Sequence, residues 1–134
     1  MNRLASIVLA ALLLTGTAEP VEPAEMVRPA AIELFPEKEF LGVFEATGYC
    51  SCEKCCGKWA DGITYSGTVA EEGRTIAVDP DVIPLGSVVE ISGHQYIAED
   101  IGGGINGKEI DLFFADHRDA WNFGRQKHDV YLVK

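Results

Sequence analysis

Residues 77–114, AVDPDVIPLGSVVEISGHQYIAEDIGGGINGKEIDLFF, carry the strongest fold signal in this chain. Three apolar stretches of this segment each contain or end in one aspartate, namely Asp79, Asp100 and Asp111. A carboxylate beside an apolar strand is costly unless it is hydrogen-bonded, paired or protonated. Three such positions in one short segment therefore predict a site built from carboxyl groups.

Short strand patterns recur along the second part of the chain. They predict strands over residues 43–49, 74–78, 87–91, 95–100, 108–115 and 130–133. Residues 92–94, Ser-Gly-His, predict a hairpin turn between two of these strands. The pattern indicates an all-β fold with a short helix, closed into a small barrel.

The short helix is predicted over residues 116–124. Asp116 is a suitable N-cap and Gly124 a natural C-terminal stop. We expect Trp121 and Phe123 of this segment to be packing residues, because large aromatic side chains are usually buried.

The N-terminal part of the chain predicts export. Residues 1–18 resemble a signal peptide, with Arg3 before an apolar run and small residues at positions 16–18. A retained anchor is the alternative, but the apolar run is short for a membrane span. Residues 19–39 hold four prolines and six glutamates, which is typical of an extended linker. The folded domain is then predicted over residues 40–134.

The chain is acidic, with a formal net charge of −10. Without residues 1–18 it keeps 10 basic and 21 acidic residues, a formal charge of −11. This balance argues against nucleic acid as a partner and against electrostatic attachment to anionic lipid. With the signal removed no stable membrane span is expected, so the predicted location is outside the cell or in the cell envelope.

Several segments occur in the order of a known family. The run from Ala77 to Phe114, the upstream ATGYCSCEKCCG at residues 46–57 and the polar segment at residues 64–68 together resemble the 3D domain. That family is named for its three aspartates, is found in cell-wall-active proteins, and is similar to the catalytic barrel of MltA-type lytic transglycosylases and of stationary-phase muralytic enzymes. The resemblance covers residues 43–134 and implies a double-psi β-barrel.

The resemblance also implies an activity, the cleavage of peptidoglycan glycan strands by a lytic transglycosylase that needs no cofactor. It places the catalytic acid at Asp111, with Asp100 and Asp79 in support. Apolar neighbours and the other two carboxylates predict a raised pKa for Asp111, as a general acid requires. Candidate substrate-binding residues are Thr47, Tyr49, Gly102, Gly103 and Gly104.

Structural roles for the aspartates are the alternative. Asp111 could pair with Arg118 or Arg74, and the other two could accept hydrogen bonds from nearby backbone N–H groups. Glu99 precedes one of the three aspartates and should point to the opposite face of its strand, where we expect it to be solvated. The sequence places none of the three histidines as a catalytic base.

Four cysteines fall within seven residues: Cys50, Cys52, Cys55 and Cys56. In an exported chain an even number of thiols favours disulfides, which we expect here between members of this cluster. Bound metal and free thiols are the alternatives. Structural zinc usually takes ligands from two separated segments, so no metal is expected from this single cluster.

Three other classes of function compete with the transglycosylase. The first is a non-catalytic module that binds the cell wall or a glycan on the same barrel, because a fold does not determine an activity. The second is a disulfide- or metal-dependent protein centred on the cysteines. The third, an aspartic-protease-like dyad, lacks the expected Asp-Thr-Gly or Asp-Ser-Gly sequence at Asp100-Ile101-Gly102. The sequence makes no prediction about oligomeric state.

Overall fold

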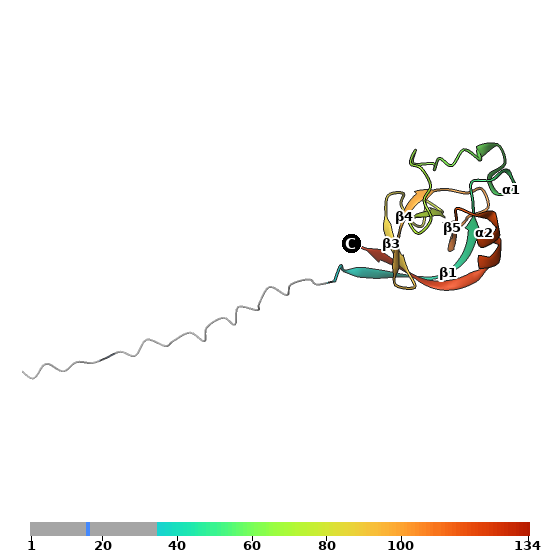
Figure 1. Ribbon diagram of the computed structural model, residues 1–134. Helices are drawn as coiled ribbons and strands as arrows, with labels where there is room; N and C mark the ends of the chain where they lie inside the picture. Colours follow the sequence, from blue (N-terminus) through green and yellow to red (C-terminus); the bar gives the residue numbers. More distant parts are fainter. Residues whose placement is uncertain (1–15, 17–34) are drawn as a thin grey trace, which may run out of the picture. The chain divides into compact units, whose positions relative to one another are not determined.

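Residues 35–134 form one unit of strands with short helices at its side (Figure 1). The computed structural model describes these residues and Gly16. The elements, in chain order, are β1 (Lys38–Tyr49), α1 (Glu53–Cys56), the 3-10 helix η1 (Gly57–Trp59), β2 (Thr75–Val78), β3 (Val88–Ile91), β4 (His94–Asp100), β5 (Glu109–Phe113), α2 (His117–Phe123) and β6 (Gln126–Val133). The predicted signal peptide and the linker as far as residue 34 lie outside the described residues, apart from Gly16.

The six strands close into a barrel in the order β1-β5-β2-β4-β3-β6. Two neighbouring pairs are parallel, β1 with β5 and β2 with β4, and the other pairs are antiparallel. The pairing of β1 with β6 closes the ring and brings the two ends of the domain together, with Lys38 opposite Val133. The predicted mainly-β closed barrel is therefore confirmed.

The core fills the inside of this ring. Its largest members, each no more than 1% exposed, come from different strands and from the loop after β2: Phe44, Ile76, Val78, Ile83, Val89, Ile110 and Val130. The partly alternating burial along β3 and β5 gives one inward and one outward face, as expected of a half-buried strand. Burial of these aliphatic side chains is the main force that holds the barrel together.

The predicted turn chemistry is confirmed at the β3–β4 hairpin. Ile91 pairs with His94, so Ser92 and Gly93 form a two-residue loop with φ angles of 52° and 78°. Positive φ at both positions is typical of a type I′ turn, which fits the twist of the flanking strands.

Helix α2 packs against β1, and its predicted ends are confirmed. The side chain of Asp116 accepts a 2.7 Å hydrogen bond from the backbone N–H of Arg118, and Gly124 follows the last turn. A Cβ at Gly48 of β1 would lie 2.9 Å from the carbonyl oxygen of Ala120 in the helix, so the close approach requires glycine here.

Two expectations about packing and helices were wrong. Trp121 is 78% exposed, although it was expected to pack, whereas Phe123 lies against Phe114 with ring centroids 5.4 Å apart. The sequence also gave no sign of α1 and η1, which together contain no buried residue and so show no apolar periodicity. In the described residues no helix has the length and apolar character needed to cross a membrane.

Candidate active site

Four neighbouring strands carry the centre of the site in one row across the sheet. Thr47 of β1 pairs with Asp111 of β5, which pairs with Ala77 of β2, which in turn pairs with Asp100 of β4. Paired residues on adjacent strands point to the same face of a sheet. Asp111 and Asp100 are thus separated by one strand, at which the small Ala77 side chain leaves open space.

Asp111 is half-buried, and one side chain holds its carboxyl group. The hydroxyl of Thr47 donates a 3.0 Å hydrogen bond to Oδ1 of Asp111. Burial raises the pKa of Asp111 to about 6; the Thr47 hydrogen bond lowers it in part, and the charge of Asp100 adds to the rise. The predicted upward shift is therefore present, and its main cause is desolvation.

Asp100 has both carboxyl oxygens occupied by donors. The backbone N–H groups of Tyr65 and Ile101 each donate to Oδ1 at 2.9 Å, and the hydroxyl of Tyr49 donates to Oδ2 at 2.7 Å. Three donors of this kind suit a carboxylate that stays fixed in place. Burial, together with this hydrogen bond to Asp100, raises the pKa of Tyr49, so its hydroxyl remains a donor.

The row of aspartates opens into a cavity of about 680 Å³. Its polar wall includes Asp111, Asp100 and Tyr49, and Gly102 and Gly103 also line it. Its rim carries three apolar side chains that are largely exposed: Trp59 at 69%, Tyr65 at 68% and Ile63 at 49%. These three belong to the segment between β1 and β2, and none of them was predicted as a site residue. The two aromatic residues on either side of Asp61, in a segment without strand or helix pattern, were the signal that the sequence offered.

Some predicted site residues do not line this cavity. Thr47 contacts Asp111 from the neighbouring strand and is not part of the lining, and Gly104 is also outside it. Asp79 also lies outside it: its carboxyl group accepts hydrogen bonds from the backbone N–H of Gly107 at 2.7 Å and of Asp81 at 3.0 Å. The bond from Gly107, then that from Asp81, lowers the pKa of Asp79. The geometry of Asp79 thus fits a clamp between two loops.

The expectation that Glu99 is solvated was wrong. Glu99 is 4% exposed and accepts hydrogen bonds from Arg74 Nη2 and from the hydroxyl of Thr75, both at 2.8 Å. It points away from Asp100 as predicted by strand alternation, but the face it reaches is covered. Arg74 therefore forms its ion pair with Glu99, and Arg118 forms one with Asp119 at 3.5 Å. The alternative pairing of Asp111 with one of these two arginines is not what the structure has.

The cysteines do not form the disulfides that were expected. All four are free thiols, and the shortest separation that the structure gives between two of their sulfur atoms is 3.0 Å, from Cys50 Sγ to Cys52 Sγ. A disulfide bond is about 2.05 Å long. His117, from the start of α2, joins three of these thiols, and the four ligand atoms of Cys50, Cys52, Cys55 and His117 lie within 4.8 Å of one another.

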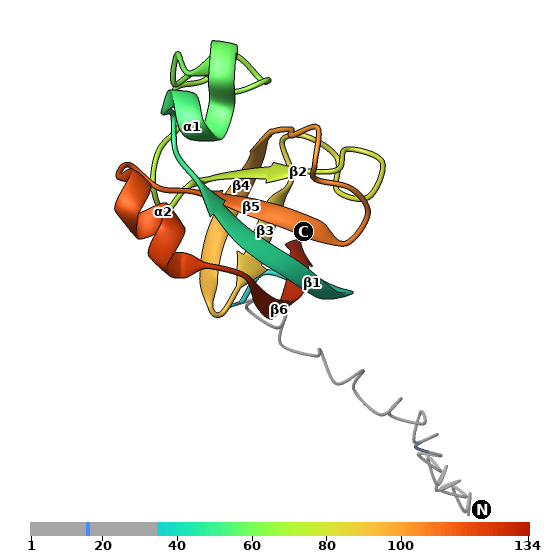
Figure 2. The same ribbon diagram turned by 90° about the vertical axis from the view of Figure 1, so that its right-hand side faces the viewer.

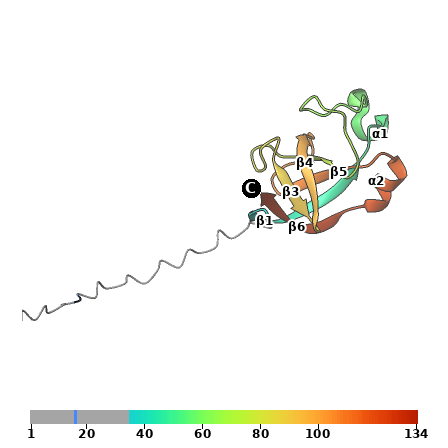
Figure 3. The same ribbon diagram turned by 60° about the vertical axis from the view of Figure 1, so that its left-hand side comes forward.

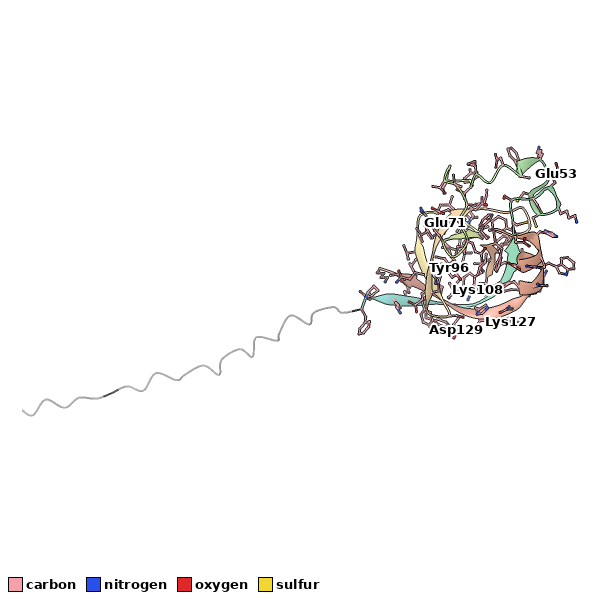
Figure 4. The ribbon with its side chains drawn as sticks, viewed as in Figure 1. Glu53, Glu71, Tyr96, Lys108, Lys127 and Asp129 are labelled. Atoms are coloured by element: carbon pink, nitrogen blue, oxygen red, sulfur yellow. The ribbon has the colours of Figure 1, made fainter. Side chains whose placement is uncertain are left out.

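A second hollow of about 390 Å³ lies over β3 and β6 and contains none of the three aspartates. Its lining includes Lys127 and Asp129, which Figure 4 shows at the other end of the domain from Glu53 of α1. Of the two hollows, the larger cavity is therefore the one that holds Asp100 and Asp111.

Comparison with known proteins shows which family the domain resembles. Residues 74–134 match the family model of the 3D domain. "Putative cell wall shaping protein YabE" of Bacillus subtilis is 41% identical over 84 residues, which cover 62% of this chain and 20% of YabE. Cell wall-binding protein YocH of B. subtilis is 43% identical over 76 residues, which cover 54% of this chain and 26% of YocH. The chain thus spans about a quarter or less of the length of these two relatives.

Among solved structures, E. coli MltA with bound chitohexaose is similar over 54% of this chain and 27% of MltA, with 18% identity and a TM-score of 0.48. All three aspartates of the sequence motif lie within the matched residues 74–134. The predicted family resemblance is confirmed: residues 74–134 of this chain match the 3D domain, and the two relatives of similar sequence are cell-wall proteins by name.

Proposed function

We propose that this protein is a lytic transglycosylase that cleaves the glycan strands of peptidoglycan and leaves 1,6-anhydromuramyl ends. The observation that carries the proposal is the position of Asp111, half-buried in the wall of a 680 Å³ cavity with its pKa raised to about 6. A carboxyl group whose pKa lies close to neutral pH can donate a proton to a glycosidic oxygen, as a general acid must, and can accept one back as a carboxylate.

In this mechanism one carboxyl group acts twice. Asp111 first gives its proton to the glycosidic oxygen as the bond to the anomeric carbon breaks. It then accepts, as a carboxylate, the proton of the muramyl C6 hydroxyl while that oxygen attacks the anomeric carbon. Attack within one sugar avoids an external nucleophile, whose effective concentration is far lower.

The environment of Asp100 favours this one-acid mechanism over hydrolysis by a pair of carboxyl groups. A second catalytic carboxylate has to activate water or bond to the sugar. Both oxygens of Asp100 already accept hydrogen bonds, from Tyr49 and from two backbone N–H groups. Its negative charge raises the pKa of Asp111 and would stabilise an oxocarbenium-like centre in the cavity between them.

The rim of the cavity suits a glycan strand as the partner. Trp59 and Tyr65 expose most of their ring surface beside the polar wall, and flat apolar rings of this kind pack against the faces of sugars. Gly102 and Gly103 also line the cavity. At Gly103 an added Cβ would meet open space, so a ligand can approach the backbone there.

The names of the two relatives support a cell-wall substrate, since they describe shaping and binding of the wall. They also support a location outside the cell or in its envelope. For the fold, we infer the double-psi type of barrel. The support is the alternation of two parallel strand pairs, β1 with β5 and β2 with β4, in a closed ring of six.

A second candidate function is a non-catalytic module that binds the wall. The specific observation in its favour is the name of YocH, a cell wall-binding protein, together with the exposed rings at the rim. Both functions use the same cavity, but only the first needs the proton of Asp111.

Cleavage of purified peptidoglycan by the full chain separates the two functions. We expect products with 1,6-anhydromuramyl ends by mass spectrometry, no product from Asp111→Asn, and normal activity for the exposed control Asp129→Asn. In heavy-oxygen water the products should carry no label at the cleaved anomeric carbon, because no water attacks. Binding without any product would establish the binding module, and incorporation of label would replace the transglycosylase with a hydrolase.

A further inference from the structure

We propose that the domain holds a structural Zn²⁺ ion through four side chains from two distant parts of the sequence, Cys50, Cys52, Cys55 and His117. The site uses none of the carboxyl groups of the neighbouring cavity, and the proposal does not depend on the activity of the protein.

The distances between the four ligand atoms fit one central ion. Nδ1 of His117 lies 3.5 Å from Sγ of Cys50, 3.3 Å from that of Cys52 and 3.5 Å from that of Cys55. A tetrahedral zinc ion with ordinary bond lengths would set sulfur and nitrogen ligands about 3.5 to 3.6 Å apart. Sγ of Cys50 also lies 3.6 Å from Sγ of Cys55, close to the roughly 3.8 Å expected between two sulfur ligands, and the 3.0 Å to Cys52 is shorter.

The ligands reach this point from three elements. Cys50 directly follows β1, Cys52 and Cys55 lie at the start and within the short helix α1, and His117 is the first residue of α2. Figures 1, 2 and 3 show α1 and α2 on the same side of the barrel, next to the end of β1. The fold therefore brings His117, from a second segment of the chain, to the cysteine cluster, which has no such ligand of its own.

The fourth cysteine, Cys56, is not one of the ligands. The thiol of Cys56 is not among the four clustered ligand atoms and instead donates a 3.1 Å hydrogen bond to the carbonyl oxygen of Cys50. Cys56 also lines the cavity, as does Cys55 at the edge of the cluster. The arrangement selects three of four neighbouring thiols and one imidazole, which is the ligand set of a Cys₃His zinc site.

The segment has little else to hold it in place. Neither α1 nor η1 buries a residue, so the hydrophobic core stops short of residues 53–59. A metal that binds the folded chain and not the unfolded one adds its binding free energy to folding, so it can hold a stretch of chain that does not reach the core. Four protein ligands also leave no open position for substrate, which makes the site structural. By fixing η1, the ion would hold Trp59 at the rim of the cavity.

The test is the metal content of the full chain, purified without chelator and with reductant present. We expect about one zinc per chain by elemental mass spectrometry, and metal-free protein that binds Co²⁺ should show thiolate-to-cobalt charge-transfer absorption. Cys52→Ser and His117→Asn should lose zinc. The matched controls Cys56→Ser and His128→Asn should keep it, since neither side chain belongs to the ligand set.

Thermal unfolding gives a second readout. It uses wild type and Cys56→Ser, so it does not depend on whether the ligand variants fold. Chelation should lower the melting temperature of wild type and of Cys56→Ser by about 10 °C or more, and added Zn²⁺ should restore it. Zinc-free wild type would overturn the proposal, and so would two disulfides found by intact mass in a second preparation made without reductant. Equal loss of zinc from Cys56→Ser and Cys52→Ser would also overturn it, because the assigned ligands would be wrong.

Discussion

Replacing Asp111 with asparagine should stabilise the folded domain near neutral pH. Burial raises the pKa of Asp111 from 3.8 to about 6, so ionising this carboxyl group costs more free energy in the folded chain than in the unfolded one. A raised pKa in the folded state contributes stability at low pH that is lost as pH rises. For Asp111 the loss begins near pH 4 and is complete just above pH 6. Asparagine does not ionise and avoids this loss.

The magnitude follows from the size of the shift. About two pKa units at 1.36 kcal/mol each correspond to roughly 3 kcal/mol, and the solvent-facing part of the half-buried side chain reduces this to about 2 kcal/mol. For a domain of this size, 1 kcal/mol moves the melting temperature by about 4 to 8 °C, so we expect a rise of roughly 10 °C. The asparagine can still accept the hydrogen bond from Thr47, which now ends at Oδ1 of Asp111.

The assay is thermal and urea unfolding of wild type, Asp111→Asn and the exposed control Asp129→Asn at pH 4 and pH 7.5. The difference between wild type and Asp111→Asn isolates one carboxyl group, because all other titrating groups are shared. We expect the two midpoints to lie close together at pH 4 and apart at pH 7.5, with the asparagine variant more stable. Equal midpoints at pH 7.5, or a less stable asparagine variant, would refute the burial argument for the general acid.

Three further predictions concern activity and binding. Thr47→Val removes a hydrogen bond that lowers the pKa of Asp111, so the alkaline limb of the pH–rate profile should move to higher pH. Trp59→Ala should weaken binding of glycan fragments about tenfold in calorimetry, with an unchanged urea midpoint because the ring is 69% exposed. Asp79→Asn should leave the pH–rate profile unchanged, because its carboxyl group clamps backbone N–H groups outside the cavity; a shifted profile would instead return Asp79 to the catalytic group.

The local features of the fold could be predicted from the sequence. Short runs of strand-forming residues located all six strands, although β1 begins at Lys38 and β6 at Gln126, earlier than expected. A Ser-Gly turn located the β3–β4 hairpin. Asp116 and Gly124 marked the ends of α2. Each of these signals depends on the backbone preference or burial period of a few neighbouring residues. The raised pKa of Asp111 belongs to the same group, because its apolar neighbours in the sequence already imply burial.

What the sequence left open depends on contacts between distant segments. The register that places Ala77 between Asp100 and Asp111 puts these two carboxyl groups on one wall and leaves Asp79 outside it. In the same way Arg74 covers Glu99, which by strand alternation alone would face solvent.

The cysteine cluster shows the difference most clearly. By sequence it is one short run of thiols in an exported chain, for which disulfides are the reasonable expectation. In the fold, His117 comes within 3.5 Å of three of those thiols from 62 to 67 residues away. Sequence patterns report burial and backbone preference, which are local. Closure of the barrel by long-range strand pairing decides which side chains meet, and it is this pairing that turns a cysteine run into a four-ligand cluster.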